Sequence, residues 1–271
     1  MVSKFASILG KKYYMKRLKA LFLYMLGTLG QIVIVCIAVY LLRRSGLTVN
    51  YTSPIGLAAI TVGGISSALW GTIISIRYRK STIKTVLSDF FRIKQSYKNY
   101  LLMVFFIFLD FLPFVFGGSI VVSAWYLPII MFFKHIAFGG IEEIGWRYLF
   151  QPVLQERINY VLATTLTFVA WGIWHFLYFF IEGTISDIDA LPFLIGLITN
   201  CFILSALFTK TKNLWLCVMT HSLINVCSQL FTEGNVYVSY ACKALIVAVA
   251  IVIVYFCKGH KCDEMEYYSS T

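Results

Sequence analysis

The sequence predicts an all-α fold: a polytopic membrane helix bundle of about eight transmembrane helices, with its functional core in the fourth to seventh. Hydrophobic residues make up 59% of the 271 residues and charged residues 13%, whereas a soluble domain typically carries about 25% charge. The mean hydropathy is +0.80, and apolar runs of about 20 residues, enough for one crossing, recur along the chain. The longest polar stretch, residues 77–99, is itself patterned like a helix, so we expect no separate soluble domain.

Eight apolar runs are predicted to cross the membrane. They cover residues 20–42, 54–76, 100–118, 126–147, 160–181, 190–208, 213–232 and 237–257. The first run is too long for the apolar part of a signal peptide and lacks a small-x-small cleavage site, so we expect it to remain as a span.

The chain is predicted to divide into three parts. Residues 1–125 hold a basic N-terminal segment, three spans and a cytoplasmic interfacial helix over 77–99. Residues 126–232 hold the functional core, and residues 233–271 hold the last span and a cytoplasmic tail.

The surplus of basic residues indicates orientation in a membrane. The net charge is +11, and the bases gather in two places, with six in residues 1–19 and seven in the loop 77–99. The positive-inside rule predicts that both termini are cytoplasmic. We expect an integral, multi-pass protein of the plasma membrane. This distribution gives no reason to expect a nucleic-acid partner.

The basic loop predicts contact with the bilayer surface. Ile83, Val86, Leu87 and Phe90 recur at helical spacing, opposite bases such as Lys84. This pattern predicts an interfacial helix lying on anionic headgroups. A plain solvated connector is the alternative.

The cysteines predict no disulfide framework or metal finger. All seven are scattered, mostly within apolar runs, and no C-x-x-C pair occurs. We interpret them as small buried hydrophobic residues. They are Cys36, Cys201, Cys217, Cys227, Cys242, Cys257 and Cys262.

Two adjacent carboxylates in the predicted fourth span are the strongest functional signal. The stretch Gly140-Ile-Glu-Glu-Ile-Gly-Trp-Arg147 places Glu142, Glu143 and Arg147 in apolar surroundings. A carboxylate at bilayer depth costs several kcal/mol unless it is paired or faces a wet cavity, so the pair is a functional-site hypothesis. On a helix, Glu143 and Arg147 share a face and form a structural ion pair, while Glu142 points about 100° away and is left for chemistry.

Two further polar pairs lie in the predicted fifth and seventh spans. Trp171 precedes His175 by one turn and can wall the pocket of the imidazole, and His221 and Asn225 are four residues apart on one face. The amide of Asn225 can orient a group bound to the histidine or bind a developing oxyanion. The alternatives are that each histidine joins two helices by a hydrogen bond, or that the residues line a proton-coupled transport pathway.

The three patterns together resemble those of the CPBP family of intramembrane proteases, also called Abi, which includes CAAX prenyl endopeptidases and bacteriocin-processing or self-immunity proteins. The first motif matches at Glu142, Glu143 and Arg147, the second at His175 with Trp171 in the place usually held by Phe, and the third at His221 and Asn225. The resemblance covers residues from about 130 to 228. Two departures concern the shape of the cavity: Tyr148 replaces a frequent Gly, and Phe176-Leu177-Tyr178 stands where a Pro often occurs.

The resemblance implies an intramembrane endopeptidase that cuts a membrane-associated peptide or protein, as in CAAX-type or bacteriocin or signal-peptide processing. Glu142 would activate a water with help from His175, and His221 and Asn225 would stabilise the oxyanion. Zinc held by Glu142, His175 and His221 stays open as an alternative, although no H-E-x-x-H is present and a carboxylate that ligates metal cannot equally serve as the base. The alternative function is a non-catalytic immunity or sensor-regulating protein that keeps the fold and binds a membrane-protein partner.

Asp110 and Lys134 are charged residues that no motif covers. Both are expected near mid-bilayer in neighbouring spans, where a lone ion is too costly to persist. We therefore predict that they form an ion pair; the alternatives are proton relay by Asp110 or snorkelling of Lys134.

Overall fold

The computed structural model describes residues 2–232 and 234–259, with side chains over 17–232 and 234–256. The α-helices are α1 (Val2–Arg44), α2 (Pro54–Gly64), α3 (Ser66–Arg79), α4 (Ile83–Phe90), α5 (Tyr97–Phe111), α6 (Leu127–Phe138), α7 (Glu143–Gly145), α8 (Gln151–Gln155), α9 (Tyr160–Glu182), α10 (Ala190–Thr211), α11 (Leu214–Leu230) and α12 (Val236–Gly259). Short helical turns lie at η1 (Leu112–Val115), η2 (Gly140–Glu142), η3 (Trp146–Phe150) and η4 (Ile185–Asp187), of which η3 is a π-helix. Most of the predicted C-terminal tail, residues 260–271, lies outside the described residues.

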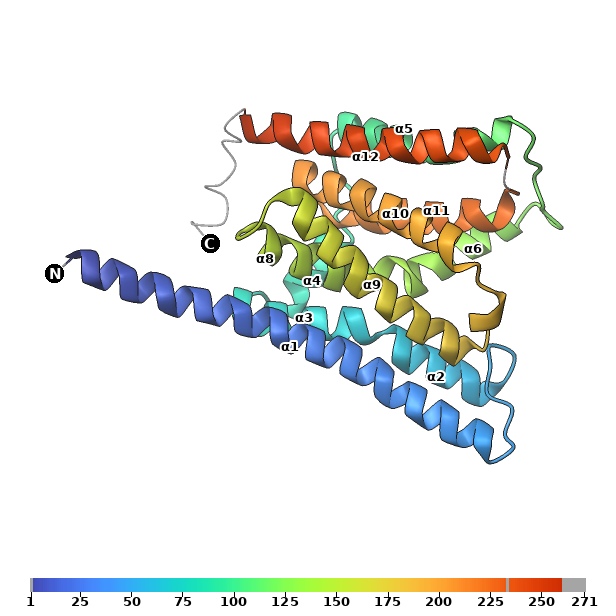
Figure 1. Ribbon diagram of the computed structural model, residues 1–271, viewed down its shortest axis with the longest axis horizontal. Helices are drawn as coiled ribbons and strands as arrows, with labels where there is room; N and C mark the ends of the chain where they lie inside the picture. The colour runs from blue at the N-terminus through green and yellow to red at the C-terminus, as the bar shows by residue number, and fades with distance from the viewer. Residues whose placement is uncertain (1, 233, 260–271) are drawn as a thin grey trace.

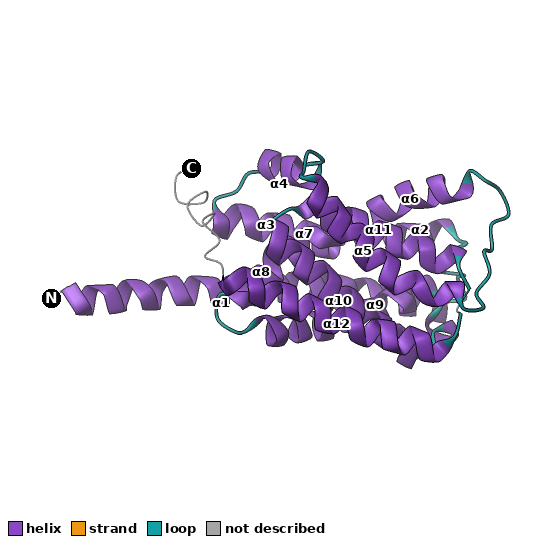
Figure 2. Ribbon diagram, turned by 90° about the horizontal axis from the view of Figure 1, so that it is seen from above, coloured by secondary structure: helices purple, strands orange, loops and turns teal. Residues whose placement is uncertain are grey.

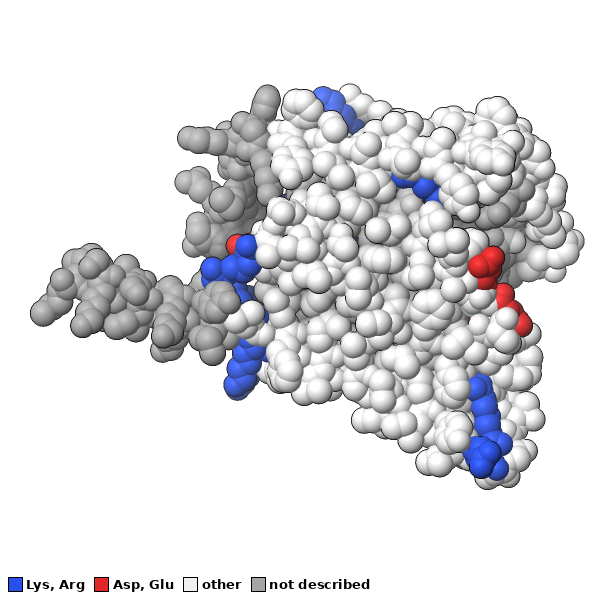
Figure 3. All heavy atoms as spheres, viewed as in Figure 1, with Lys and Arg blue, Asp and Glu red and all other residues white. Residues whose placement is uncertain are grey.

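The prediction of an all-α polytopic bundle is confirmed. Among the described residues, six helical segments are long and apolar enough to cross a membrane: 17–44, 54–79, 97–115, 160–182, 190–211 and 236–256. The predicted seventh span corresponds to α11, a shorter apolar helix of 17 residues. The face drawn in Figure 3 carries few charged side chains between its two ends, as expected for a surface in contact with lipid tails.

The helices form a layered bundle (Figure 1). On one side α12 packs along α10 and α5, and on the other α1 packs against α2, α3 and α9. Between these layers lie α10 and α11, with α6 packed against α11. The irregular segment from η2 to η3 contacts α3, α10 and α11, so the motif carboxylates are enclosed by helices from distant parts of the sequence.

The expectation of one continuous helix over residues 126–147 is wrong. The helix α6 ends at Phe138, and the chain then continues through η2, α7 and the π-helix η3 before α8 begins. Gly139 and Gly140 stand at the break, where a Cβ on Gly140 would lie 2.7 Å from Val218 Cγ1 of α11. The absence of a side chain permits this close approach, and hydropathy alone does not report such local changes in helix type.

Small residues bring α3 against the irregular segment. A Cβ on Gly71 would lie 2.7 Å from the Cα of Gly145, so the two backbones nearly touch. Small residues at helix interfaces allow such approach in membranes. This packing places Ser67 of α3 directly behind the motif carboxylates.

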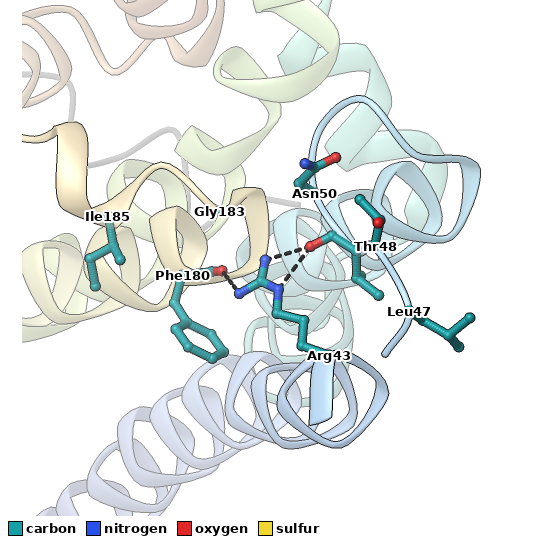
Figure 4. Close-up of a pocket in the computed structure, with 8 residues that line it drawn as sticks. Arg43, Leu47, Thr48, Asn50, Phe180, Gly183 and Ile185 are labelled. Atoms are coloured by element: carbon teal, nitrogen blue, oxygen red, sulfur yellow. Dashed lines mark hydrogen bonds between the residues drawn. The ribbon is translucent and has the colours of Figure 1, made fainter. Parts of the chain in front are cut away.

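Arg43 joins the loop after α1 to the end of α9 (Figure 4). Its guanidinium donates to the carbonyl oxygens of Val49 at 2.8 Å, Phe180 at 2.9 Å and Ile181 at 3.0 Å. The last carbonyls of a helix have no partner within the helix, so Arg43 supplies donors that α9 itself lacks. A pocket between this loop and the end of α9 is lined in part by Arg43. The guanidinium of Arg43 already forms hydrogen bonds with backbone carbonyls there.

A helix is present in the predicted basic loop, but it is shorter than residues 77–99. It comprises only α4, because α3 extends to Arg79 and α5 begins at Tyr97. Val86 and Phe90 are buried against the protein, while Ile83 and Leu87 are exposed. Figure 2 shows α4 at the edge of the bundle, near the end of α3.

The predicted ion pair between Asp110 and Lys134 is wrong. Asp110 of α5 pairs instead with Lys243 of α12, with 3.3 Å between Oδ1 and Nζ, and Lys134 lies exposed on α6. The prediction assumed that spans adjacent in sequence are adjacent in space, whereas α5 packs against the last helix. The cost of a lone charge still explains why Asp110 has a partner.

Charge reversal tests this pairing against the rejected one. Asp110→Lys and Lys243→Asp are each expected to reduce the amount of folded protein, because each leaves two like charges facing one another at low exposure. The double variant should recover part of the loss, whereas Asp110→Lys combined with Lys134→Asp should not. Size-exclusion chromatography of the fluorescently tagged protein measures the folded fraction; recovery by the Lys134 combination instead would overturn the pairing seen in the structure.

Candidate active site

Trp171 lies at the centre of the three motifs. Its indole Nε1 donates to Glu142 Oε2 at 2.7 Å, and its ring centroid lies 4.9 Å from that of His175 and 5.3 Å from that of His221. The sequence analysis placed Trp171 only as a pocket wall. In the structure it contacts a residue of every motif, and it thereby gathers Glu142, His175 and His221 around one side chain.

Glu142 is held through both its side chain and its backbone. The residue is 4% exposed, and its carbonyl oxygen accepts a hydrogen bond from Ser67 Oγ at 3.1 Å. Tyr24 OH and Ser67 Oγ are 2.9 Å apart, which links α1 to the same point. Glu142 therefore has hydrogen-bond partners, whereas the sequence predicted that it is left for chemistry alone.

Tyr24 and Ser67 were missed by the sequence analysis. Neither the first nor the second predicted span carries a motif residue. The only available signal was Ser66-Ser67 among apolar residues, because a buried hydroxyl needs a hydrogen-bond partner.

Glu143 has two partners. Its Oε2 lies 3.4 Å from Arg147 Nε, in the expected i,i+4 pair, and its Oε1 lies 2.8 Å from His221 Nδ1. Both Glu143 and Arg147 are fully buried. Arg147 also lies over the Trp171 ring, with Cζ 4.3 Å from the centroid, and donates to Cys201 Sγ at 3.3 Å. Glu143 thus joins the first motif to the third, which the sequence analysis did not predict.

The partners of the two histidines define which ring nitrogen faces the site. His175 Nδ1 lies 2.9 Å from the carbonyl oxygen of Trp171, and His221 Nδ1 lies 2.8 Å from the carboxylate of Glu143. A carbonyl and an ionised carboxylate only accept hydrogen bonds, so each Nδ1 carries the hydrogen. Nε2 of both rings is then the nitrogen left for chemistry.

The side chains of Asn225 and His221 lie close to Gly139. A Cβ on Gly139 would lie 2.8 Å from Asn225 Nδ2 and 3.4 Å from His221 Nε2. The amide and the imidazole therefore lie next to each other, as expected from their spacing of four residues on α11. One turn further along α11, Gln229 Nε2 lies 2.8 Å from His135 Nε2 and ties α11 to α6.

The described residues do not gather as a metal site. Among the described parts of the chain, no three side chains of the His, Cys, Asp and Glu types lie close enough together to hold a metal ion.

A family model matches the part of the chain that holds the three motifs. Residues 120–227 match the family model described as Rce1-like, type II CAAX prenyl endopeptidase. The match includes all three motifs and confirms the family resemblance that they predicted. Comparison of the chain with curated proteins gave no significant match.

Proposed function

We propose that this chain, which matches an Rce1-like family model over residues 120–227, is a CAAX-type intramembrane protease that hydrolyses a peptide bond in a membrane-associated peptide or protein. The observation that carries the proposal is the convergence of Glu142, His175 and His221 on Trp171. These are the residue types that move protons and stabilise charge in hydrolysis, and they come from three separate helical segments.

In the proposed reaction, Glu142 accepts a proton from a water while His175 Nε2 accepts the water's second hydrogen bond and orients it. The resulting hydroxide attacks the scissile carbonyl carbon. The oxyanion that forms is stabilised by Asn225 Nδ2 and by His221 protonated at Nε2, whose positive charge Glu143 balances through Nδ1. Glu142 then gives its proton to the departing nitrogen, which releases an amine and a carboxylic acid.

The substrate side of the proposal is tested with defined peptides. Purified protein in lipid nanodiscs is incubated with two fluorogenic peptides of the same sequence, one farnesylated at the cysteine of a C-terminal CAAX box and one unmodified. Cleavage of either by wild type and not by Glu142→Gln supports the endopeptidase. Cleavage of the farnesylated peptide alone assigns a CAAX-type substrate.

The non-catalytic alternative makes an opposite prediction in cells. Mass spectrometry compares membrane peptides from cells that express wild type or Glu142→Gln at equal levels. An enzyme leaves products that the variant lacks, whereas a regulatory partner leaves both peptide sets alike. Identical peptide sets together with uncut peptides in nanodiscs would exclude the protease.

A further inference from the structure

Tyr148, the residue that departs from the family pattern directly after Arg147, connects the active site to the surface helix α4. Its side chain is 8% exposed, and its phenol donates to Asp89 Oδ2 at 2.8 Å. Asp89 lies in the last turn of α4, outside every motif. A glycine at position 148 would leave this carboxylate without the bond.

The backbone at Tyr148 is also held from outside its own helix. Tyr148 lies in the π-helix η3, and Pro152, four residues later, has no N–H to donate to the Tyr148 carbonyl. Arg79 Nη1 donates to that carbonyl instead, and its guanidinium lies 5.3 Å from the centre of the Tyr148 ring. The turn that carries Arg147 therefore depends on side chains from α3 and α4 for part of its hydrogen bonding.

The segment that follows α4 is in turn bonded to the start of α11. Arg92, three residues after Asp89 and 3.7 Å from it, donates through Nη2 to the Lys212 carbonyl at 2.7 Å. The Arg92 carbonyl accepts from Asn213 Nδ2 at 3.1 Å, and Asn213 caps α11 by accepting from Leu216 N at 2.8 Å. His221 follows about two turns along this helix.

We propose that Tyr148 and Asp89 are positioning residues for the reaction proposed above: their hydrogen bond makes α4 a brace between the π-helix that carries Arg147 and the helix that carries His221. Without the brace, the π-helix loses its side-chain anchor on α4, and Arg147 is then free to move away from Cys201 and Trp171. Glu143 then loses its fixed position between Arg147 and His221. The inference rests on the proposed function for its catalytic consequence, but the geometry of the brace can be measured without catalysis.

The test follows the alkylation of Cys201, whose thiol is buried against Arg147. N-ethylmaleimide labelling of the protein in nanodiscs is quantified by mass spectrometry, with Cys36 on α1 as an internal reference. Tyr148→Phe and Asp89→Leu remove the two ends of the bond, and each is expected to raise the Cys201 rate about tenfold, the effect of one hydrogen bond to a charged group. Tyr100→Phe is the matched control, because it removes a phenol bonded to the Ile93 carbonyl on the same side of the bundle.

Two further variants separate a brace from a general loss of stability. Asp89→Asn keeps an acceptor oxygen for the phenol but removes the charge that faces Arg92, so it should label Cys201 at a rate between those of wild type and Asp89→Leu. The double variant Tyr148→Phe/Asp89→Leu should label no faster than the faster single variant, because both changes break one bond. The same single variants should lower kcat about tenfold with KM nearly unchanged, since the phenol does not touch substrate.

The proposal is overturned if both single variants label Cys201 within about twofold of wild type, or if their effects multiply in the double variant. If the brace proposal fails, wild type should still cleave the peptide and Glu142→Gln should still not cleave it. Failure of the proposed function, conversely, leaves the Cys201 rates to decide the brace.

Discussion

Glu142→Gln is expected to lower kcat by about 100- to 10,000-fold while the protein still folds, because a correctly placed general base contributes that much and an amide cannot take a proton from water. Glutamine keeps the shape of the side chain, and its amide oxygen still accepts from Trp171 Nε1, which lies 2.7 Å from the carboxylate. The loss should therefore appear in kcat, measured with the cleaved peptide, and not in the unfolding temperature.

The matched control is Glu182→Gln, the same chemical change at the end of α9. It should leave cleavage near the wild-type rate. Replacement of His175 or His221 by glutamine should also reduce kcat. Unchanged cleavage in Glu142→Gln would remove this carboxylate from the mechanism, and an equal loss in Glu182→Gln would show that the effect is not specific to the site.

Arg147→Ala and Glu143→Ala are expected to have the largest effects on folding. Both side chains are fully buried and face one another at 3.4 Å, so removal of one strands an unpaired charge at a cost of about 3–5 kcal/mol. Because native proteins are typically stable by only about 5–15 kcal/mol, either variant should accumulate poorly. The measurement is the amount of monodisperse protein recovered from membranes and its unfolding temperature.

A double variant separates the structural role of the pair from its role toward His221. Glu143→Leu/Arg147→Met removes both charges at similar volume, which is often tolerated. Folding should recover relative to the single variants, whereas cleavage should not, because His221 Nδ1 still lacks the carboxylate that lies 2.8 Å away. Normal accumulation of both alanine variants would contradict burial of the pair, and recovered cleavage in the double variant would contradict the link to His221.

Much of the local geometry of the site could be predicted, because residues four apart in a motif lie on one face of a helix. Glu143 and Arg147 are four residues apart and pair, and His221 and Asn225 are four apart and lie together over Gly139. Such local geometry follows from helical periodicity. The roles of these residues in catalysis are proposals. Their pairwise arrangement could be predicted from this one sequence.

What could not be predicted depends on which helices are neighbours in space and on small changes in backbone bonding. Lys243, the partner of Asp110, lies 133 residues away in the chain, and depth within the bilayer alone does not select it. The π-helix over Trp146–Phe150 has the same hydropathy as an α-helix of that sequence. Within it, the Tyr148 carbonyl cannot receive a bond from Pro152 and accepts one from the side chain of Arg79.

The broken fourth segment also constrains how the protein is assembled. The helix α6 has 12 residues and rises about 18 Å, less than the roughly 30 Å of a hydrocarbon core, and the irregular backbone after it is tolerated at membrane depth only when protein surrounds it. Of the helices that enclose it, α3 is synthesised earlier, but α10 and α11 are synthesised later. During translation, this segment therefore stays at the membrane surface or inside the insertion machinery until those helices are made. In a chain truncated after residue 159, the cysteine of an Ile141→Cys variant should be accessible to a water-soluble maleimide. The carboxylates would enter the bilayer last, once their neighbours are already there.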